Sequence, residues 1–213
     1  MFRDRTDAGR QLARALAGKS LPDPVVLALP RGGVPVAAEV AHALKAPLDL
    51  LLVRKIGAPF QRELAVAAVA EGGALAINED VLDEVGADHG YVERQAQAEV
   101  REIERRRALY MGARPPTPVA GRSAIVIDDG IATGATMRAA LRLLRERRPA
   151  RIVLAVPVAP PDTVESMRPL VDDLVCLEAP PYFHAVGAHY GDFEQVDDAT
   201  VRDLLAAAAA GGA

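Results

Sequence analysis

Apolar and polar residues alternate along the chain in two distinct patterns. Uninterrupted apolar runs predict buried strands at residues 25–30, 48–53, 124–128, 151–158 and 173–178. Apolar residues spaced three or four positions apart predict helices at residues 6–17, 36–44, 89–111, 136–147, 162–167 and from 199 onward. Because the apolar runs have no polar face and alternate with helices, we expect an α/β fold in which helices flank both faces of a parallel sheet.

Residues 57–73 interrupt this alternation. Glycines stand at both ends of the stretch, which contains the β-compatible run ELAVAAVA, and LAIN at residues 75–78 can return as a partner strand. We therefore expect a charged turn at 54–57, followed by a loop and hairpin inserted between sheet elements. The hairpin can be static, or its first half can move as a lid over a site. The pattern leaves both possibilities open.

The composition supports one folded domain over residues 1–213. Half of the 213 residues are hydrophobic and a quarter are charged, which suffices for a buried core. Lys and Arg total 25 against 29 Asp and Glu, a net charge of −4, so no overall basic field draws the chain to nucleic acid or anionic lipid.

A single cysteine, Cys176, excludes an intramolecular disulfide and a zinc site built on several thiolates, and it favours a cytoplasmic location. Every apolar stretch is shorter than the ~20 residues that span a bilayer, so we expect no membrane insertion.

The most informative segment is AIVIDDGIATGATM, residues 124–137. A buried strand carries two adjacent carboxylates, Asp128 and Asp129, to its carboxyl end, where open α/β sheets bind ligands. A loop of small and hydroxyl-bearing residues then opens a helix, and its N–H groups suit a phosphate. Carboxylates accept hydrogen bonds from sugar hydroxyls. The segment therefore offers partners for a ribose and its 5-phosphate together.

Competing signatures are absent from the sequence. The chain has no G-x-x-x-x-G-K-[ST] run, no G-x-G-x-x-G after a strand and no G-x-S-x-G elbow, which argues against P-loop, Rossmann and hydrolase sites. A plain strand-to-helix turn is the remaining alternative. Two carboxylates at a buried strand end cost solvation unless a ligand uses them, which favours a binding site.

AIVIDDGIATGAT resembles the phosphoribosyl-diphosphate (PRPP) signature of type I phosphoribosyltransferases. The shared pattern is four apolar residues, two acids, two spacers, and a small residue before Thr-Gly-x-Thr. Gly130 departs from it, because the family usually has an aliphatic residue there. The resemblance implies that Asp128 and Asp129 hold the ribose hydroxyls, and Mg²⁺ largely through PRPP. It also implies a 5-phosphate site formed by Ala132, Thr133, Gly134, Ala135 and Thr136.

Two further segments match the family in the same order. Pro30-Arg31-Gly32-Gly33 follows the first strand, where the family has its diphosphate loop, so the resemblance implies pyrophosphate binding by Arg31, Gly32 and Gly33. Arg54 and Lys55 resemble the basic pair that meets the same pyrophosphate in orotate-type members. Taken alone, a helix-opening turn and a solvated strand end explain these two segments as well.

The whole chain also resembles a group of uncharacterised bacterial phosphoribosyltransferase-like proteins, which share LPRGG, LVRKIGAP, EGG and AVGAHYGDF with it. The fold that this resemblance implies is a single domain, with a core over about 22–178 and a small hood from about 1–20 and 179–205. A homodimer is suggested by resemblance alone.

By resemblance, the chain is a phosphoribosyltransferase that uses PRPP and Mg²⁺ to transfer a 5-phosphoribosyl group to a nitrogenous base, with release of pyrophosphate. The implied catalytic residues are Asp128, Asp129, Lys55 and Arg31, and positive charge among them would stabilise the departing pyrophosphate. Arg62 and Glu63, in the inserted loop, are candidate lid residues.

The acceptor base is constrained only in part. Ala132 stands where members acting on 6-oxopurines have an Asp, which disfavours a 6-oxopurine and leaves adenine-type and orotate-type bases open. Aromatic residues gather in one late segment, where Tyr182 and Phe183 are candidates for stacking on the base. A small satellite core is the alternative role for this segment.

A second function is a regulator that senses PRPP, keeps the fold and binds nucleic acid or a partner. Its contact surface would be the basic residues of the predicted helix 89–111, namely Arg101, Arg105, Arg106 and Arg107. Interleaved glutamates and the acidic net charge favour a solvated helix face instead, so we do not expect nucleic acid as a partner. PRPP synthesis needs two domains with this signature, and a degenerate scaffold is disfavoured because the implied ligand-binding residues are all present.

Overall fold

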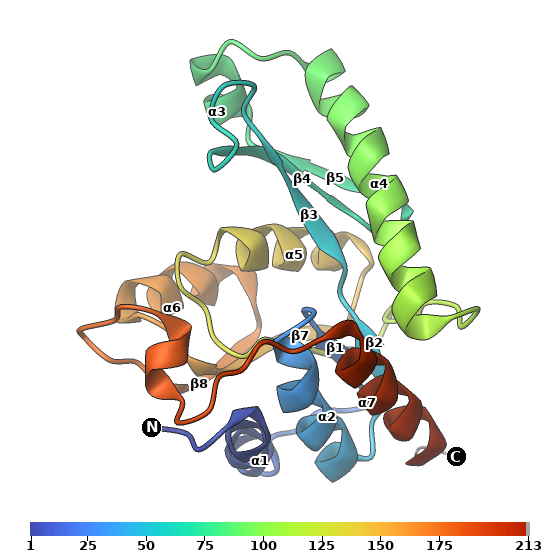
Figure 1. Ribbon diagram of the computed structural model, residues 1–213, viewed down its shortest axis with the longest axis vertical. Coiled ribbons are helices and arrows are strands. Elements are labelled where there is room, and N and C mark those ends of the chain that lie inside the picture. The colour runs from blue at the N-terminus through green and yellow to red at the C-terminus, as the bar shows by residue number, and fades with distance from the viewer. Residues whose placement is uncertain (212–213) are drawn as a thin grey trace.

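The main sheet has five parallel strands in the order β2-β1-β6-β7-β8 (Figure 1). The computed structural model describes residues 1–211, and the last two residues of the expected domain, 212 and 213, lie outside that range. The strands are β1 (Pro24–Ala28), β2 (Leu48–Leu50), β6 (Ser123–Ile127), β7 (Arg151–Val158) and β8 (Asp173–Glu178). Every neighbouring pair is parallel, which confirms the predicted α/β sheet.

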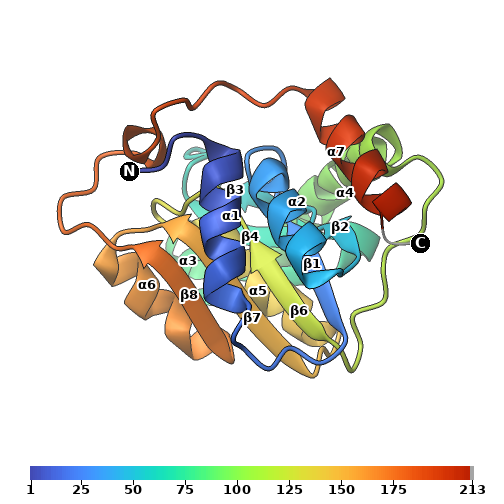
Figure 2. The ribbon, with the colours of Figure 1, turned by 90° about the horizontal axis from the view of Figure 1, so that it is seen from below.

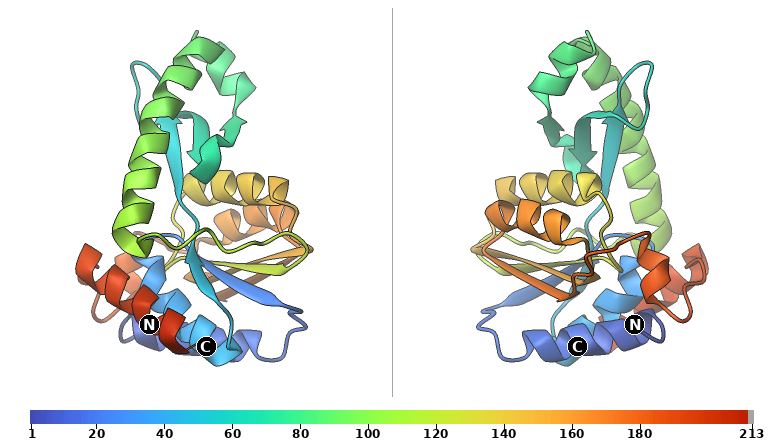
Figure 3. Two further views of the ribbon diagram at one scale, coloured as in Figure 1. Left: turned by 90° about the vertical axis from the view of Figure 1, so that its right-hand side faces the viewer. Right: turned by 90° about the vertical axis from the view of Figure 1, so that its left-hand side faces the viewer.

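Helices cover both faces of this sheet (Figure 3). One face carries α1 (Arg5–Leu16), α2 (Gly33–Leu44) and α7 (Asp198–Gly211), and the other carries α5 (Ala135–Glu146) and α6 (Pro161–Met167). Along β1, Val26 and Ala28 join the core on the α1 side, whereas Val25 and Leu27 join the core on the α5 side. Burial on both faces explains why the strands read as uninterrupted apolar runs.

A second sheet, antiparallel, projects from the first (Figure 1). Its strands are β3 (Val53–Gly57), β4 (Ala65–Ala70) and β5 (Leu75–Ile77). It lies between α4 (His89–Met111) and α5, and α3 (Glu79–Glu84) leads from β5 toward α4. Short 3₁₀ turns complete the chain: η1 (Glu71–Gly73), η2 (Arg168–Leu170) and η3 (Val186–His189). The predicted inserted hairpin is thus present as β4 and β5, with β3 as a third strand.

The single strand predicted at 48–53 is wrong. β2 ends at Leu50 and β3 begins at Val53, so Leu51 and Leu52 carry the chain from one sheet to the other. The Leu51 N–H donates to a carbonyl of β1, while the Leu52 carbonyl accepts from η1. Both side chains are buried, so the apolar run continues without a change from β2 to β3. The break between the two strands is evident only from their pairing in different sheets.

The charged turn predicted at 54–57 is also wrong. Arg54 and Lys55 lie inside β3, paired with Val69 and Ala68 of β4. The basic pair therefore does not follow a strand of the parallel sheet but belongs to the second sheet. The reason is long-range pairing with residues 65–70, which a local charge pattern does not report.

A buried ion pair anchors α4 to the main sheet. Arg107 Nη1 and Nη2 donate to the two carboxylate oxygens of Asp49 at 2.8 and 3.2 Å, and Arg107 Nε lies 3.0 Å from Glu71 Oε1. The Arg107 side chain is only 7 % exposed. Arg107 is therefore removed from the surface that the nucleic-acid alternative would require.

The beginning of the chain meets the segment after η3. Phe2 forms a parallel bridge with Tyr190, and its N–H donates to the His189 carbonyl at 2.9 Å. From there, residues 190–197 run along the edge where α1 and α2 begin (Figure 2). In residues 1–211, no helix combines the length and the apolar character needed to cross a bilayer.

Candidate functional site

The loop after β1 and the acids after β6 lie against each other. The two strands are adjacent and in register, with Ala28 opposite Ile127, so their carboxyl ends coincide. A Cβ on Gly33 would lie 2.8 Å from the Ile127 carbonyl oxygen and 2.9 Å from Asp128 Cα. Glycine at this position lets the start of α2 approach the acidic strand end. The structure therefore brings Gly32 and Gly33 together with Asp128 and Asp129.

The two neighbouring acids differ in their surroundings. Asp128 Oδ1 accepts the N–H of Asp129 at 2.9 Å. Burial raises the pKa of Asp128 well above its ordinary value, and the adjacent charge of Asp129 raises it further. Burial also raises the pKa of Asp129, but Arg5 opposes that rise by hydrogen bonding and by its charge.

Arg5 was not predicted as a site residue. Its Nε donates to Asp129 Oδ2 at 2.8 Å across a sequence separation of 124 residues. Tyr190 also reaches the site, since its hydroxyl donates to the Asp129 carbonyl oxygen at 2.5 Å. The only sequence signal for Tyr190 was its place in the late aromatic segment, and no local signal distinguishes Arg5 from the other arginines of the first helix.

The segment 132–136 forms the turn into α5. Gly134 has a positive φ of 74°, which favours glycine, and α5 begins at Ala135. Neighbouring side chains fix the carbonyls of this turn, because Thr163 Oγ1 donates to Ala132 at 2.8 Å and Arg138 Nη2 donates to Thr133 at 2.7 Å. The N–H groups of the first helical turn have no partner within the helix. The turn thus has the geometry of an anion site.

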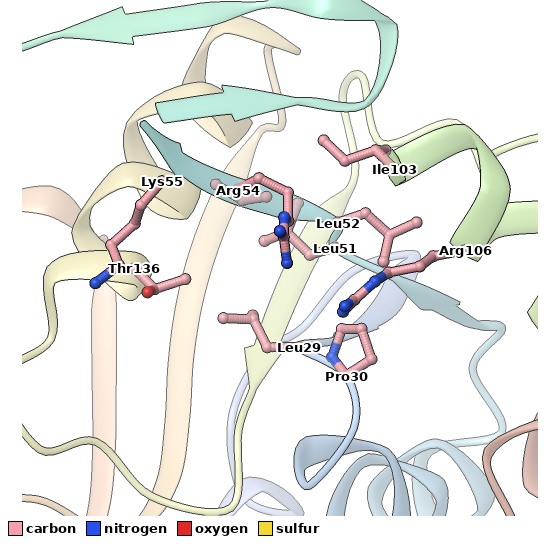
Figure 4. A pocket seen from close by; sticks show the side chains of 10 residues that line it. Leu29, Pro30, Leu51, Leu52, Arg54, Lys55, Ile103, Arg106 and Thr136 are labelled. Atoms are coloured by element: carbon pink, nitrogen blue, oxygen red, sulfur yellow. The ribbon is translucent and has the colours of Figure 1, made fainter. Parts of the chain in front are cut away.

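A basic pocket of about 340 Å³ lies between the two sheets (Figure 4). Its lining includes Pro30, Arg54, Lys55, Arg106 and Thr136. The guanidinium groups of Arg54 and Arg106 extend into it from β3 and α4. The pocket therefore joins the loop after β1, the basic pair of β3 and the start of α5 around one cavity with an excess of positive charge.

Each arginine of this pocket is held by a glutamate of α4. Arg54 Nε lies 2.6 Å from Glu99 Oε2, and Arg106 Nε lies 2.7 Å from Glu102 Oε1. The sequence predicted a role for Arg106 only in the alternative function, as a contact for nucleic acid. Its spacing of four residues from Glu102 indicated a helix-surface pair and gave no sign of the pocket.

Arg31 points in a different direction. The pocket lining includes Pro30 but not Arg31. Arg31 Nη1 lies 3.8 Å from Asp198 Oδ1, at the start of α7, and Asp198 Oδ1 also accepts the Tyr110 hydroxyl at 2.6 Å. The structure therefore places Arg31 near the site but does not bring its side chain together with Lys55.

The predicted lid residues lie in the loop between β3 and β4. Lys55 Nζ is 4.0 Å from Glu63 Oε2, and Arg62 is exposed. Phe60, at the same loop, is fully exposed. A second pocket of about 430 Å³, between the antiparallel sheet and α5, reaches from Glu63 to Thr133. This pocket connects the loop to the turn at residues 132–136, while movement of the loop as a lid stays a prediction.

The two candidate stacking residues have different environments. Tyr182 is 86 % exposed. Phe183 stacks on His189, with ring centroids 5.4 Å apart and an interplanar angle of 17°. Phe183 also packs against the small cluster around Phe2 and Tyr190. A contact of either residue with a base stays a prediction.

Comparison with known proteins agrees with this geometry. Residues 4–190 match the model of the phosphoribosyl transferase domain. Two Mycobacterium tuberculosis proteins, MT0597 (strain CDC 1551 / Oshkosh) and Rv0571c (strain ATCC 25618 / H37Rv), are each provisionally described as a phosphoribosyl transferase. Each is 46% identical to the chain over 205 residues, which are 96% of the chain and 46% of the relative. The chain thus spans about half the length of these curated relatives.

A solved structure is similar over almost the entire length. The crystal structure of TT1426 from Thermus thermophilus has 46% sequence identity and a TM-score of 0.87, covering 96% of this chain and 97% of that one. The family model over residues 4–190 and the 46% identity to these relatives lead to one conclusion: the chain belongs to the phosphoribosyl transferase domain family.

Proposed function

We propose that the chain transfers a 5-phosphoribosyl group from PRPP, bound with Mg²⁺, to a nitrogenous base. The observation that carries the proposal is that three features lie together: the acids Asp128 and Asp129, the turn 132–136 that follows them, and a basic pocket that reaches from Pro30 to Thr136. PRPP presents groups that suit each of them: a ribose, a 5-phosphate and a diphosphate. This match of chemical groups supports one ligand across all three features.

Each part of PRPP has its own partners in the proposal. Asp128 and Asp129 accept the ribose hydroxyls, and the turn from Ala132 to Thr136 binds the 5-phosphate. The diphosphate binds at Gly32 and Gly33 and at the cations of the basic pocket. These cations are Arg54, Lys55 and Arg106. Arg31 reaches the diphosphate only if its side chain leaves Asp198.

Mg²⁺ enters this scheme as part of the substrate. Carboxylate oxygens suit Mg²⁺, and Asp128 and Asp129 provide them. Residues 1–211 contain no group of three His, Cys, Asp or Glu side chains arranged to hold a metal. Arg5 already neutralises one oxygen of Asp129. We therefore propose that the diphosphate supplies most of the ligands of the ion.

In the proposed reaction, a ring nitrogen of the base attacks ribose C1 with its lone pair. The bond between C1 and the diphosphate oxygen breaks, and pyrophosphate leaves with the electron pair. The proton of the attacking nitrogen passes to the departing pyrophosphate or to solvent. In the transition state the ribose resembles an oxocarbenium ion and negative charge develops on the departing pyrophosphate. Cations beside the pyrophosphate stabilise that negative charge. Arg54, Lys55 and Arg106 are placed to do this, and the loop carrying Arg62 and Glu63 is the proposed cover that excludes water.

The base, the assembly and the cellular location are finer parts of the proposal. Ala132 in place of an Asp favours a base other than a 6-oxopurine, and we propose that Tyr182 or Phe183 stacks on it. A homodimer and a cytoplasmic location rest on the family resemblance and on the single cysteine, respectively.

Pyrophosphate release tests the proposal. The protein is incubated with PRPP and Mg²⁺ across a panel of purines, pyrimidines and small amines, with Asp129→Asn in parallel. We expect release with one class of base and a loss of at least about a hundredfold in Asp129→Asn, since a charged hydrogen-bonding partner of the ribose is removed. PRPP binding with no release for any base would favour the regulator, and neither binding nor release would refute the proposal.

A further inference from the structure

Arg5 connects the beginning of the chain to the acidic strand end. Besides its bond to Asp129, Arg5 Nη1 donates to the Glu194 carbonyl at 2.7 Å. Its Cζ lies 3.8 Å from the centroid of the Phe193 ring, a cation–π contact. The side chains of Arg5 and Asp129 are 12% and 14% exposed. One guanidinium therefore contacts an acid, a backbone carbonyl and an aromatic face, and solvent screens its contact with the acid only weakly.

The same region holds Asp129 through its backbone. The Tyr190 hydroxyl donates to the Asp129 carbonyl, and Phe2 packs on Tyr190 with ring centroids 5.3 Å apart. The N–H of Gly191 donates to the Phe2 carbonyl at 2.8 Å. Residues 2–5 and 190–194 thus form one unit around Asp129. Arg5 is the member of this unit that carries a charge opposite to that of the carboxylate.

Two adjacent acids need such a partner. Without a cation, the carboxylates of Asp128 and Asp129 repel each other in a partly buried place. Arg5 engages Oδ2 of Asp129 and thereby holds the orientation of that carboxylate.

We propose that Arg5 is a positioning residue of the phosphoribosyl site, which fixes the Asp129 carboxylate and balances its charge so that this carboxylate accepts a ribose hydroxyl. This inference rests on the proposed function and assigns a role to a residue outside the PRPP signature. Arg5 acts through Asp129 and does not itself touch the reacting atoms.

Three titratable or charged groups face the Asp129 carboxylate. They are Arg5 from α1, Asp128 from β6 and Tyr190 from the segment after η3. Glu178, at the end of β8, influences Tyr190 and lies 3.8 Å from His189 Nδ1. Among these groups Arg5 is the one that lowers the pKa of Asp129 by its charge. Arg5 is therefore the cation that balances the charge of the Asp129 carboxylate.

The test compares Arg5→Gln and Arg5→Lys with wild type. Calorimetry measures the affinity for PRPP with Mg²⁺ and, separately, the affinity for pyrophosphate with Mg²⁺, because pyrophosphate has no ribose. The matched control is Arg10→Gln, because Arg10 lies on the same helix and its 57%-exposed side chain pairs with Glu39. We expect Arg5→Gln to weaken PRPP binding by about tenfold and to change pyrophosphate binding by less than about twofold. Arg5→Lys should recover most of the PRPP affinity, and Arg10→Gln should change neither affinity.

The outcomes separate this inference from the proposed function. Unchanged PRPP affinity in Arg5→Gln overturns the positioning role. Equal weakening of PRPP and pyrophosphate binding in Arg5→Gln, with no recovery in Arg5→Lys, also overturns it, since that result indicates only a structural loss. If wild type binds no PRPP, the proposed function fails and takes the ribose role of Arg5 with it.

Discussion

The carboxylate of Asp129 occupies the space in which Gly32 would carry a side chain. A Cβ on Gly32 would lie less than 3.0 Å from both Oδ2 and Cγ of Asp129. Gly32 belongs to the loop after β1, and Asp129 follows β6. The residue implied in diphosphate binding is therefore packed directly against the residue implied in ribose binding, and neither can change independently of the other.

Gly32→Ala should weaken PRPP binding by about tenfold or more, because the new methyl group displaces the Asp129 carboxylate from Arg5 and from the ribose. Calorimetric titration of PRPP with Mg²⁺ measures the loss. The control is Gly18→Ala, since a Cβ on Gly18 meets no heavy atom within 4 Å. Equal PRPP affinities for the two variants would contradict the arrangement.

Gly130 is the one departure from the PRPP signature, and its surroundings explain it. A Cβ there would lie 2.5 Å from Val186 Cγ1 and 3.0 Å from Val158 Cγ1. Val186 of η3 therefore occupies the space that a side chain at position 130 would need. We expect Gly130→Ala to reduce the free energy of unfolding by about 1–3 kcal/mol through overpacking.

A rescue variant makes this prediction specific. In Gly130→Ala/Val186→Ala, the methyl group nearest to residue 130 is removed, so urea denaturation should show the two changes to be less than additive. Strict additivity would mean that the crowding between these two positions does not exist.

Arg106 and Arg105 offer a matched pair for the basic pocket. Both pair with Glu102, but Arg106 lines the pocket, whereas the Arg105 side chain is 62% exposed and lies outside the lining. Arg106→Gln should raise the inhibition constant of pyrophosphate in the transfer reaction by about tenfold, because the diphosphate loses one charged hydrogen-bonding partner. Arg105→Gln should change it by less than about twofold. Similar effects of the two variants would remove Arg106 from the diphosphate site.

Asp128 should make stability depend on pH in an unusual direction. Burial and the charge of Asp129 raise the pKa of Asp128 well above its ordinary value of 3.8. A carboxyl with a raised folded-state pKa contributes stability below its ordinary pKa, and this contribution is lost as the pH rises through the folded-state pKa. Asp128→Asn removes the buried charge but keeps an acceptor oxygen for the Asp129 N–H.

We therefore expect Asp128→Asn to unfold at a higher temperature than wild type at neutral pH, and the difference to shrink as the pH falls toward 3.8. Thermal unfolding across this range gives the result. The same variant should bind PRPP more weakly. A variant that is less stable than wild type at neutral pH would show that the buried charge of Asp128 does not destabilise the folded protein.

The sequence predicted the parallel sheet and the acidic strand end because these features are local. β6 is apolar on both faces and Asp128 follows its last residue, Ile127, and both properties are visible in the residues themselves. The turn at Gly134 was predictable for the same reason, since its positive φ favours glycine.

Long-range pairing was not predictable from these patterns. The break between Leu50 and Val53 follows from the partner strand β4, and the apolar run passes through it unchanged. Arg5 contacts Asp129 across a sequence separation of 124 residues. Arg106 lines the pocket because α4 packs against β3. Contacts of this kind depend on the folded arrangement, and no spacing along the chain encodes them.

The central claim is that PRPP binds at the acids after β6, and equilibrium binding of labelled PRPP in the presence of Mg²⁺ tests it most directly. We predict saturable binding of one PRPP per chain in wild type, and loss of that binding in Asp128→Asn/Asp129→Asn. The double variant keeps the shape of both side chains and removes only their charge. No saturable binding in wild type, or equal binding in the double variant, would contradict the account.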